Sequence, residues 1–226
     1  MDFANHDCHS DAYIRYNPEN DKVEMIARQK YFKGDEVCVS YGQKTNGELL
    51  LSYGFLPAKD TNPHDGCLLP FKLSESHPGY TWKSKFLETI DGSCSRLFLL
   101  KMTAIPVELE RFATFAVAPV KNIEETQKLF ENLIGYDDAQ PPPLANKSRT
   151  SKLLLLGIRL VVEQCKAQLA EYLVKKGPVE SLGVGPNQNE LPRADLITQV
   201  ILHEQRVLHR TIFIMEQRLQ LLKKSK

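Results

Sequence analysis

The chain has 226 residues, a charged fraction of 25% and a formal net charge of +1 at pH 7. This length allows one large domain or two modest ones, and a hydrophobic fraction of 42% is ordinary for a soluble globular protein. The nearly balanced charge argues against a nucleic-acid partner, because no basic excess is present to neutralise phosphates.

Five cysteines occur without a CxxC pair, and this odd, scattered set favours free thiols in a reducing compartment. His6, Cys8 and His9 lie close together, but no second group of ligands follows at a conventional spacing, so we expect no metal. No apolar run reaches membrane-spanning length, and residues 1–20 lack the basic start and apolar stretch of a signal peptide. We therefore expect no membrane partner.

Residues 1–75 have β character. Alternation of apolar and polar residues over 11–18 and 21–29 predicts two strands, and a run rich in β-branched residues over 36–42 predicts a third. The segments between them carry the Asn, Asp, Gly and Pro of turns. Residues 46–55 are predicted to form a short helix.

Residues 76–105 carry mixed signals, with Pro78, Gly79 and Gly92 marking loops. The pattern becomes helical from Pro106. Proline is favoured in the first turn of a helix, so Pro106 marks the expected start. Apolar residues at helical spacing predict four helices, over 106–117, 122–134, 151–176 and 192–224. A proline-rich linker near 137–148 separates the second from the third, and a Gly/Pro-rich loop near 175–192 separates the third from the fourth. The fold class is therefore α+β, with a β-rich piece over 1–75 and a helical piece over 76–226.

Tyrosines are the conspicuous polar side chains of the β-rich piece. The sequence shows no Ser-His-Asp order, no phosphate-binding glycine loop and no convincing pair of acid/base carboxylates. A tyrosine in a strand usually packs half-buried with its hydroxyl on a neighbouring carbonyl. The pattern alone therefore assigns no chemistry to these tyrosines.

The order and spacing of short motifs give further evidence about the family. Within the first 55 residues come Asp2-x-x-Asn5-His6, an Ala12-Tyr13 pair, GDEVCVSYG over 34–42, Asn46-x-Glu48, and Tyr53-Gly54-Phe55. This series resembles the C-terminal half of a SET domain of the Rubisco large-subunit lysine methyltransferase branch. The helical remainder resembles the substrate-binding domain of that branch through its helix layout and the stretch HEQRVLHRTI over 203–212.

The resemblance implies a protein-lysine N-methyltransferase that uses S-adenosyl-L-methionine. Tyr41 would be the catalytic residue. The cofactor would be held by Asn5, His6, Tyr41, Tyr53 and Phe55, and the substrate by Asp2, Tyr13, Tyr41 and Tyr53. The partner would be a protein bearing the target lysine, presented by the helical domain, and the enzyme would be a monomer.

Methyl transfer from a sulfonium is an in-line displacement, so the enzyme must align the nitrogen, the methyl group and the sulfur. A narrow tyrosine-lined channel excludes water and disfavours a charged ammonium. Tyrosine side chains, with an ordinary pKa of about 10, are poor bases at neutral pH. An orienting role is therefore expected of Tyr41.

The sequence departs from the family in two ways. The family's SET domain begins well before its Asn-His motif, with a glycine-containing loop and an arginine at the cofactor, so we expect this chain by itself to be inactive. Asp7 also follows Asn-His where many members have serine. Two alternatives stay open: a non-catalytic interaction module on a SET remnant, and a protein-histidine methyltransferase. The resemblance favours the chloroplast stroma, with cytoplasm or nucleus as the other reducing compartments.

Overall fold

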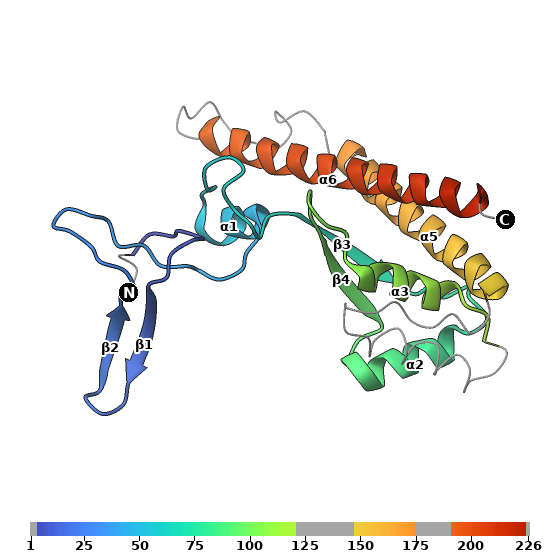
Figure 1. Cartoon of the computed structure of the whole chain (residues 1–226), viewed down its shortest axis with the longest axis horizontal. Coiled ribbons are helices and arrows are strands. Elements are labelled where there is room, and N and C mark those ends of the chain that lie inside the picture. The colour runs from blue at the N-terminus through green and yellow to red at the C-terminus, as the bar shows by residue number, and fades with distance from the viewer. Residues whose placement is uncertain (1–3, 121–146, 175–190, 225–226) are drawn as a thin grey trace. The chain divides into compact units, whose positions relative to one another are not determined.

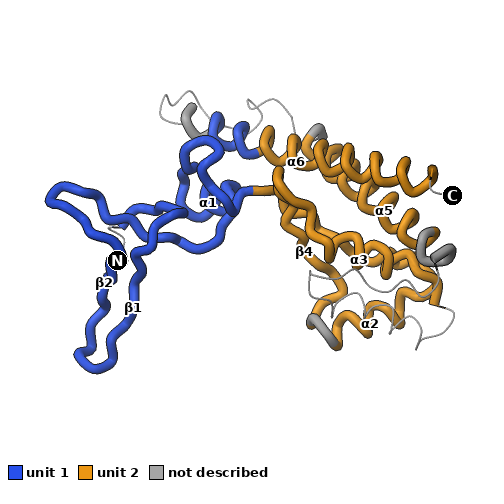
Figure 2. The backbone as a smooth tube through the Cα atoms, in the orientation of Figure 1, with its two compact units in different colours: residues 1–65, 187–200 blue, residues 66–186, 201–226 orange. Residues whose placement is uncertain are grey.

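The computed structural model describes residues 4–120, 147–174 and 191–224. These form two compact units (Figure 2): unit 1 comprises residues 1–65 and 187–200, and unit 2 comprises residues 66–186 and 201–226. The division follows Asp65, ten residues before the predicted boundary. The assignment of separate roles to 1–75 and 76–226 stays a prediction.

Unit 1 contains a two-stranded hairpin, which confirms the first two predicted strands (Figure 1). Strand β1 (Tyr13–Asn17) pairs antiparallel with β2 (Lys22–Ile26). The register places Ile14 opposite Met25 and Tyr16 opposite Val23, so these four apolar side chains share one face. Each of them is 39–59% exposed.

The strand predicted over 36–42 is wrong. This segment makes a single parallel bridge, between His6 and Val39, in which the Val39 N–H donates to the Asn5 carbonyl at 2.9 Å. The chain then turns, with the Ser10 N–H bound to the Asp7 carbonyl at 3.1 Å. Because the partner segment turns after Asp7, whose N–H donates to the Val39 carbonyl at 3.2 Å, the ladder does not continue past that residue.

Helix α1 (Asn46–Tyr53) confirms the predicted short helix. Thr45 is its N-cap: its side chain accepts from the Glu48 N–H, and the Glu48 carboxylate accepts from the Thr45 N–H at 2.7 Å, which completes a capping box. The Asp65 carboxylate accepts from the Asn46 N–H at 2.9 Å. Gly54 ends the helix in the left-handed region, at a φ of 78°.

Unit 2 contains an antiparallel pair of strands, β3 (Cys67–Lys72) and β4 (Ser95–Leu100), joined by helix α2 (Tyr80–Asp91). The sequence did not predict these three elements. Gly79 and Gly92 are the caps of α2. Glycine favours both helix ends and loops, and here it marks the limits of a helix.

Three predicted helices are confirmed. The first is α3 (Val107–Val117), and the next is α5 (Lys147–Val174), which begins four residues before its predicted start. Residues 147 and 148, predicted as linker, are therefore helical. The rest of that linker and the predicted helix over 122–134 lie outside the described residues. Helix α6 (Leu191–Lys224) is the third, and the division between the units falls within it.

The core of unit 2 forms where the two strands pack with α2, α3, α5 and α6. Edge-to-face rings from both strands and α3 lie at its centre, with Phe71 5.4 Å from Phe112 and 6.3 Å from Phe98. Buried aliphatic residues of α5 and α6, among them Ile158 and Leu208, complete it. In the described part of the chain, no helix combines the length and apolar character needed to cross a bilayer.

Candidate functional site

The His6 side chain is joined to Tyr41 in two ways. The backbone N–H of Tyr41 donates to His6 Nδ1 at 3.0 Å, and the two rings lie 5.1 Å apart. Because Nδ1 accepts this bond, the proton of a neutral imidazole is placed on Nε2. The single bridge at Val39 brings the two segments together, so the local backbone pairing fixes the ring geometry.

Four rings form what we call the aromatic cluster: His6, Tyr41, Tyr53 and Phe55. The Tyr41 and Tyr53 centroids are 4.6 Å apart, and Phe55 lies 5.9 Å from His6 and 6.4 Å from Tyr41. These spacings are within the range of favourable aromatic contacts. Tyr53 is 48% exposed and the other three rings are half-buried, so the cluster is partly accessible to solvent.

The Tyr41 hydroxyl is directed back toward the chain start. It donates to the Ala4 carbonyl oxygen at 2.7 Å. Ala4, Ala12 and Val39 form a small buried group against which Tyr41 packs. Tyr41 is therefore held at its backbone by His6 and at its hydroxyl by Ala4, which leaves little freedom for its ring.

Asn5 adds a polar group beside the cluster. Its side-chain amide donates to the Glu36 carboxylate at 2.5 Å. The sequence reasoning did not select Glu36, although it stands in the quoted stretch GDEVCVSYG. Glu36 lies in the same short stretch as Val39 and Tyr41, which pair with Asn5 and His6. A carboxylate so near in sequence to these partners is the signal that could have identified it.

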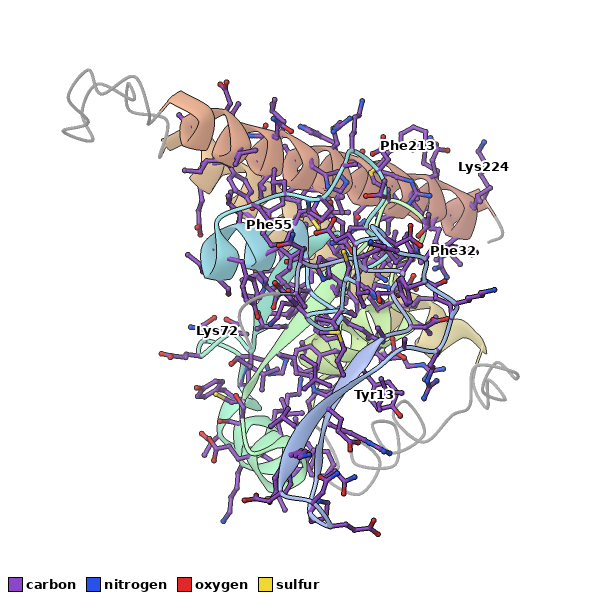
Figure 3. The ribbon with its side chains drawn as sticks, turned by 90° about the vertical axis from the view of Figure 1, so that its left-hand side faces the viewer. Tyr13, Phe32, Phe55, Lys72, Phe213 and Lys224 are labelled. Carbon is purple, nitrogen blue, oxygen red and sulfur yellow. The ribbon has the colours of Figure 1, made fainter. Side chains whose placement is uncertain are left out.

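One predicted substrate contact lies apart from this arrangement. Tyr13 lies on β1 with the Arg28 guanidinium 5.0 Å from its ring centroid, and Figure 3 shows it well separated from Phe55. Asp2 lies outside the described residues. The structure thus brings together Asn5, His6, Tyr41, Tyr53 and Phe55, and it leaves Tyr13 elsewhere. Among the residues that the structure describes, no group of three or more His, Cys, Asp or Glu could hold a metal ion.

Unit 2 has a groove of its own between β3 and α5. Its volume is about 230 Å³, and it is lined by Leu69, Pro70, Gln164, Ala167, Gln168, Glu171 and Tyr172. The Gln168 amide donates to the Leu68 carbonyl at 3.0 Å, and the Tyr172 hydroxyl donates to Glu204. Burial raises the pKa of the nearby Cys67 thiol to about 12, so this thiol stays protonated and unreactive at neutral pH.

Comparison with known families identifies the segment that holds two of the four rings of the cluster, those of His6 and Tyr41. Residues 1–42 match the SET domain family. Curated relatives include the actin-histidine N-methyltransferases of Rattus norvegicus and Homo sapiens, which are 29% and 28% identical over 120 residues. Each alignment covers 53% of this chain and 19% of the relative, so the chain spans about a fifth of their length.

Solved structures show the same fold over nearly the whole chain. The SET domain of LSMT bound to lysine and AdoHcy has a TM-score of 0.64 at 19% identity, covering 99% of this chain and 50% of that structure. Rubisco LSMT bound to sinefungin and monomethyllysine has a TM-score of 0.61 at 21% identity, covering 98% and 49%. The chain therefore carries part of a SET domain, and its fold is that of about half of the Rubisco LSMT structures.

Proposed function

We propose that this chain is part of an S-adenosylmethionine-dependent protein N-methyltransferase whose acceptor is a lysine side chain. The observation that carries the proposal is the position of Tyr41. It lies in the SYG motif of the SET match, and its ring contacts both His6 and Tyr53. Solved structures of this fold are described as bound to AdoMet, AdoHcy or sinefungin, and two of them also hold lysine or monomethyllysine.

The residues of the site fit such a cofactor. When bound, S-adenosylmethionine would supply a methyl group on a positively charged sulfur. Aromatic faces attract cations and stack on flat heterocycles, and the cluster offers four rings within 6.4 Å of their neighbours. The Glu36 carboxylate beside Asn5 adds negative charge. Asn5, His6, Tyr41, Tyr53 and Phe55 are therefore proposed to hold the cofactor.

The hydrogen bonding of Tyr41 supports a lysine acceptor. Its hydroxyl proton is already donated to Ala4, so its remaining capacity is to accept a hydrogen bond. A neutral amine carries both N–H donors and a lone pair on the same nitrogen. Tyr41 can thus accept an N–H from the attacking atom and direct its lone pair, without acting as a base.

A histidine acceptor is the second candidate, and the names of the curated relatives favour it. The attacking nitrogen of an imidazole carries no hydrogen, and its single lone pair forms the new bond, so Tyr41 can make no hydrogen bond to that nitrogen during transfer. The Tyr41 hydroxyl could instead accept from the N–H of the other ring nitrogen while it keeps its bond to Ala4. The two acceptors therefore differ in the atom that Tyr41 would orient, the attacking nitrogen of a lysine or the other ring nitrogen of a histidine.

Calorimetric titration with S-adenosylhomocysteine tests the proposal. The titration is made with this chain and with any longer native form, and each is repeated with Phe55→Ala, which removes one ring of the cluster. Binding that this substitution weakens supports the cofactor site. Binding by neither form would overturn the proposal in favour of a non-catalytic interaction module.

The acceptor is then decided by transfer of a labelled methyl group. Two peptides that differ only by lysine or histidine at one position are offered to the form that binds the cofactor. Labelling of the lysine peptide is the expected result, and labelling of the histidine peptide alone would replace lysine as the acceptor. The protein substrate would contact the helical unit, and a monomer in the chloroplast stroma, cytoplasm or nucleus stays a prediction.

A further inference from the structure

One side of α6 within unit 2 is exposed along its whole length. Seven exposed residues recur three or four positions apart, the spacing of one helix face, and we call them the outer stripe: Leu202, Arg206, His209, Phe213, Gln217, Gln220 and Lys224. At 1.5 Å per residue the stripe is roughly 33 Å long. Figure 3 shows Phe213 and Lys224 on the same edge of this helix. The stripe contains no acidic residue.

The carboxylates of this part of α6 are held by other residues, including Glu216, which is exposed and borders the stripe three residues after Phe213. Glu204 accepts a hydrogen bond from Tyr172, and Glu216 pairs with Lys166 at 2.8 Å. Arg206 and Lys224 therefore give the stripe a positive character that no carboxylate on the stripe offsets.

The arrangement along the stripe is that of an interface. Phe213 lies near its middle and is 62% exposed. Arg206 precedes it by seven residues and Lys224 follows it by eleven. Protein interfaces place aromatic and arginine side chains at their energetic centre and polar residues at the rim. An aromatic anchor between two cations fits a partner with an apolar centre and carboxylates on either side.

We propose that the outer stripe docks an acidic amphipathic helix of a protein partner. Helices bind along such surfaces through apolar anchors at helical spacing, and carboxylates would face Arg206 and Lys224. Nucleic acid fits poorly, since a duplex carries about one charge per 1.7 Å and the stripe has two permanent cations. A second copy also fits poorly, since two stripes of like charge would meet. The proposal goes beyond methyl transfer and does not depend on it.

The test uses a synthetic 22-residue helical peptide, labelled with fluorescein, with leucines at the centre of one face and glutamates toward its ends. Fluorescence anisotropy measures its binding to the whole chain. Binding is expected to weaken at least tenfold in Phe213→Ala and in Arg206→Glu, and to weaken in high salt. Leu156→Ala and Arg159→Glu likewise remove an exposed apolar side chain and reverse the charge of an exposed arginine, but on α5, and they should leave binding unchanged. Circular dichroism confirms that each variant is folded.

Three results would overturn the proposal: no binding of the acidic peptide, equal binding of a peptide with lysine in place of each glutamate, or equal losses in the α5 controls. Displacement of the peptide by a DNA duplex or by vesicles of anionic lipid, in a manner that depends on Phe213, would assign the stripe to another class of partner. The assay contains no S-adenosylmethionine. A lack of peptide binding would therefore not count against the proposed methyltransferase. A lack of cofactor binding would likewise not count against peptide binding at the stripe.

Discussion

The Tyr41 hydroxyl donates a 2.7 Å hydrogen bond to the Ala4 carbonyl oxygen. Ala4 directly precedes Asn5, so this bond ties the tyrosine of the SYG motif to the residue before the Asn-His motif. The backbone N–H of the same tyrosine donates to His6 Nδ1. Tyr41 thus binds the segment around His6, 35 residues earlier in the chain, through both its backbone N–H and its side-chain hydroxyl.

Tyr41→Phe is expected to lower methyl transfer by roughly 100-fold, because the acceptor nitrogen loses the group that orients it. The fold should be retained, with a loss of about 1 kcal/mol for the missing hydrogen bond. Transfer is measured in a form of the protein that turns over, together with thermal unfolding. Tyr16→Phe is the matched control, because it also removes one tyrosine hydrogen bond, to Asp21, on the exposed hairpin. Full activity of Tyr41→Phe would remove Tyr41 from the mechanism.

Thr45→Ala is expected to destabilise α1 by about 1 kcal/mol, since the Glu48 N–H loses the side-chain half of the capping box while the backbone half, from the N–H of residue 45 to the Glu48 carboxylate, is kept. The amide protons of α1 should exchange with deuterium about fivefold faster, as measured by NMR or mass spectrometry. Thr89→Ala serves as the comparison, because the Thr89 hydroxyl bonds only to the Lys85 carbonyl one turn earlier in α2. Unchanged exchange in Thr45→Ala would show that other contacts hold α1 in place.

Gly157→Ala is expected to destabilise unit 2 although alanine favours helices. A Cβ at this position would lie 2.8 Å from both the backbone nitrogen and the hydroxyl oxygen of Thr114, where α5 meets α3. Such overpacking costs about 1–3 kcal/mol, which outweighs a gain in helix propensity of about 1 kcal/mol. Denaturant unfolding measures the difference. A rise in the midpoint would mean that α3 and α5 can separate without cost.

The burial of Lys83 predicts that the free energy of unfolding depends on pH. It is buried on α2, and its Nζ donates to the carbonyls of Ala116 at 2.8 Å and Ala118 at 2.6 Å, at the end of α3. Burial lowers its pKa from 10.5 to about 8. Between these values the unfolded chain binds more protons than the folded one, so this residue's contribution to stability rises with pH.

The measurement compares the wild type with Lys83→Met, whose side chain does not titrate. The difference in unfolding free energy is expected to be constant below pH 8, to rise by on the order of 3 kcal/mol toward pH 10.5, and to level off above it. Titrations of other groups cancel in the difference. A difference independent of pH would show that the ammonium is as stable in the folded protein as in water.

Patterns within a short stretch of sequence predicted those elements that form from contacts within that stretch. The β1–β2 hairpin, α1 and the three long helices followed from alternation, helical spacing and caps such as Pro106. The strand over 36–42 failed because strands need partners, and only Val39 finds one. Strand β3 was missed since Pro70 interrupts it, and Pro70 is tolerated because each strand of a two-stranded sheet has a free edge.

The site could be predicted only through the resemblance. Spacing gave no reason to bring His6 against Tyr41, and a tyrosine in a β-rich segment is more often packing than chemistry. The ordered motifs supplied five residues that the structure assembles. They did not supply Glu36, whose partner Asn5 is set by backbone pairing at Val39, and the substrate role that they assign to Tyr13 on the hairpin stays a prediction.

Gly54 is the single residue between Tyr53 and Phe55, and its left-handed conformation sets how the two rings are related. Their centroids are 6.4 Å apart, and each contacts Tyr41. A residue at position 54 that disfavours this conformation would therefore change the position of the Tyr53 ring relative to the Phe55 ring, and with it the contact that each makes with Tyr41.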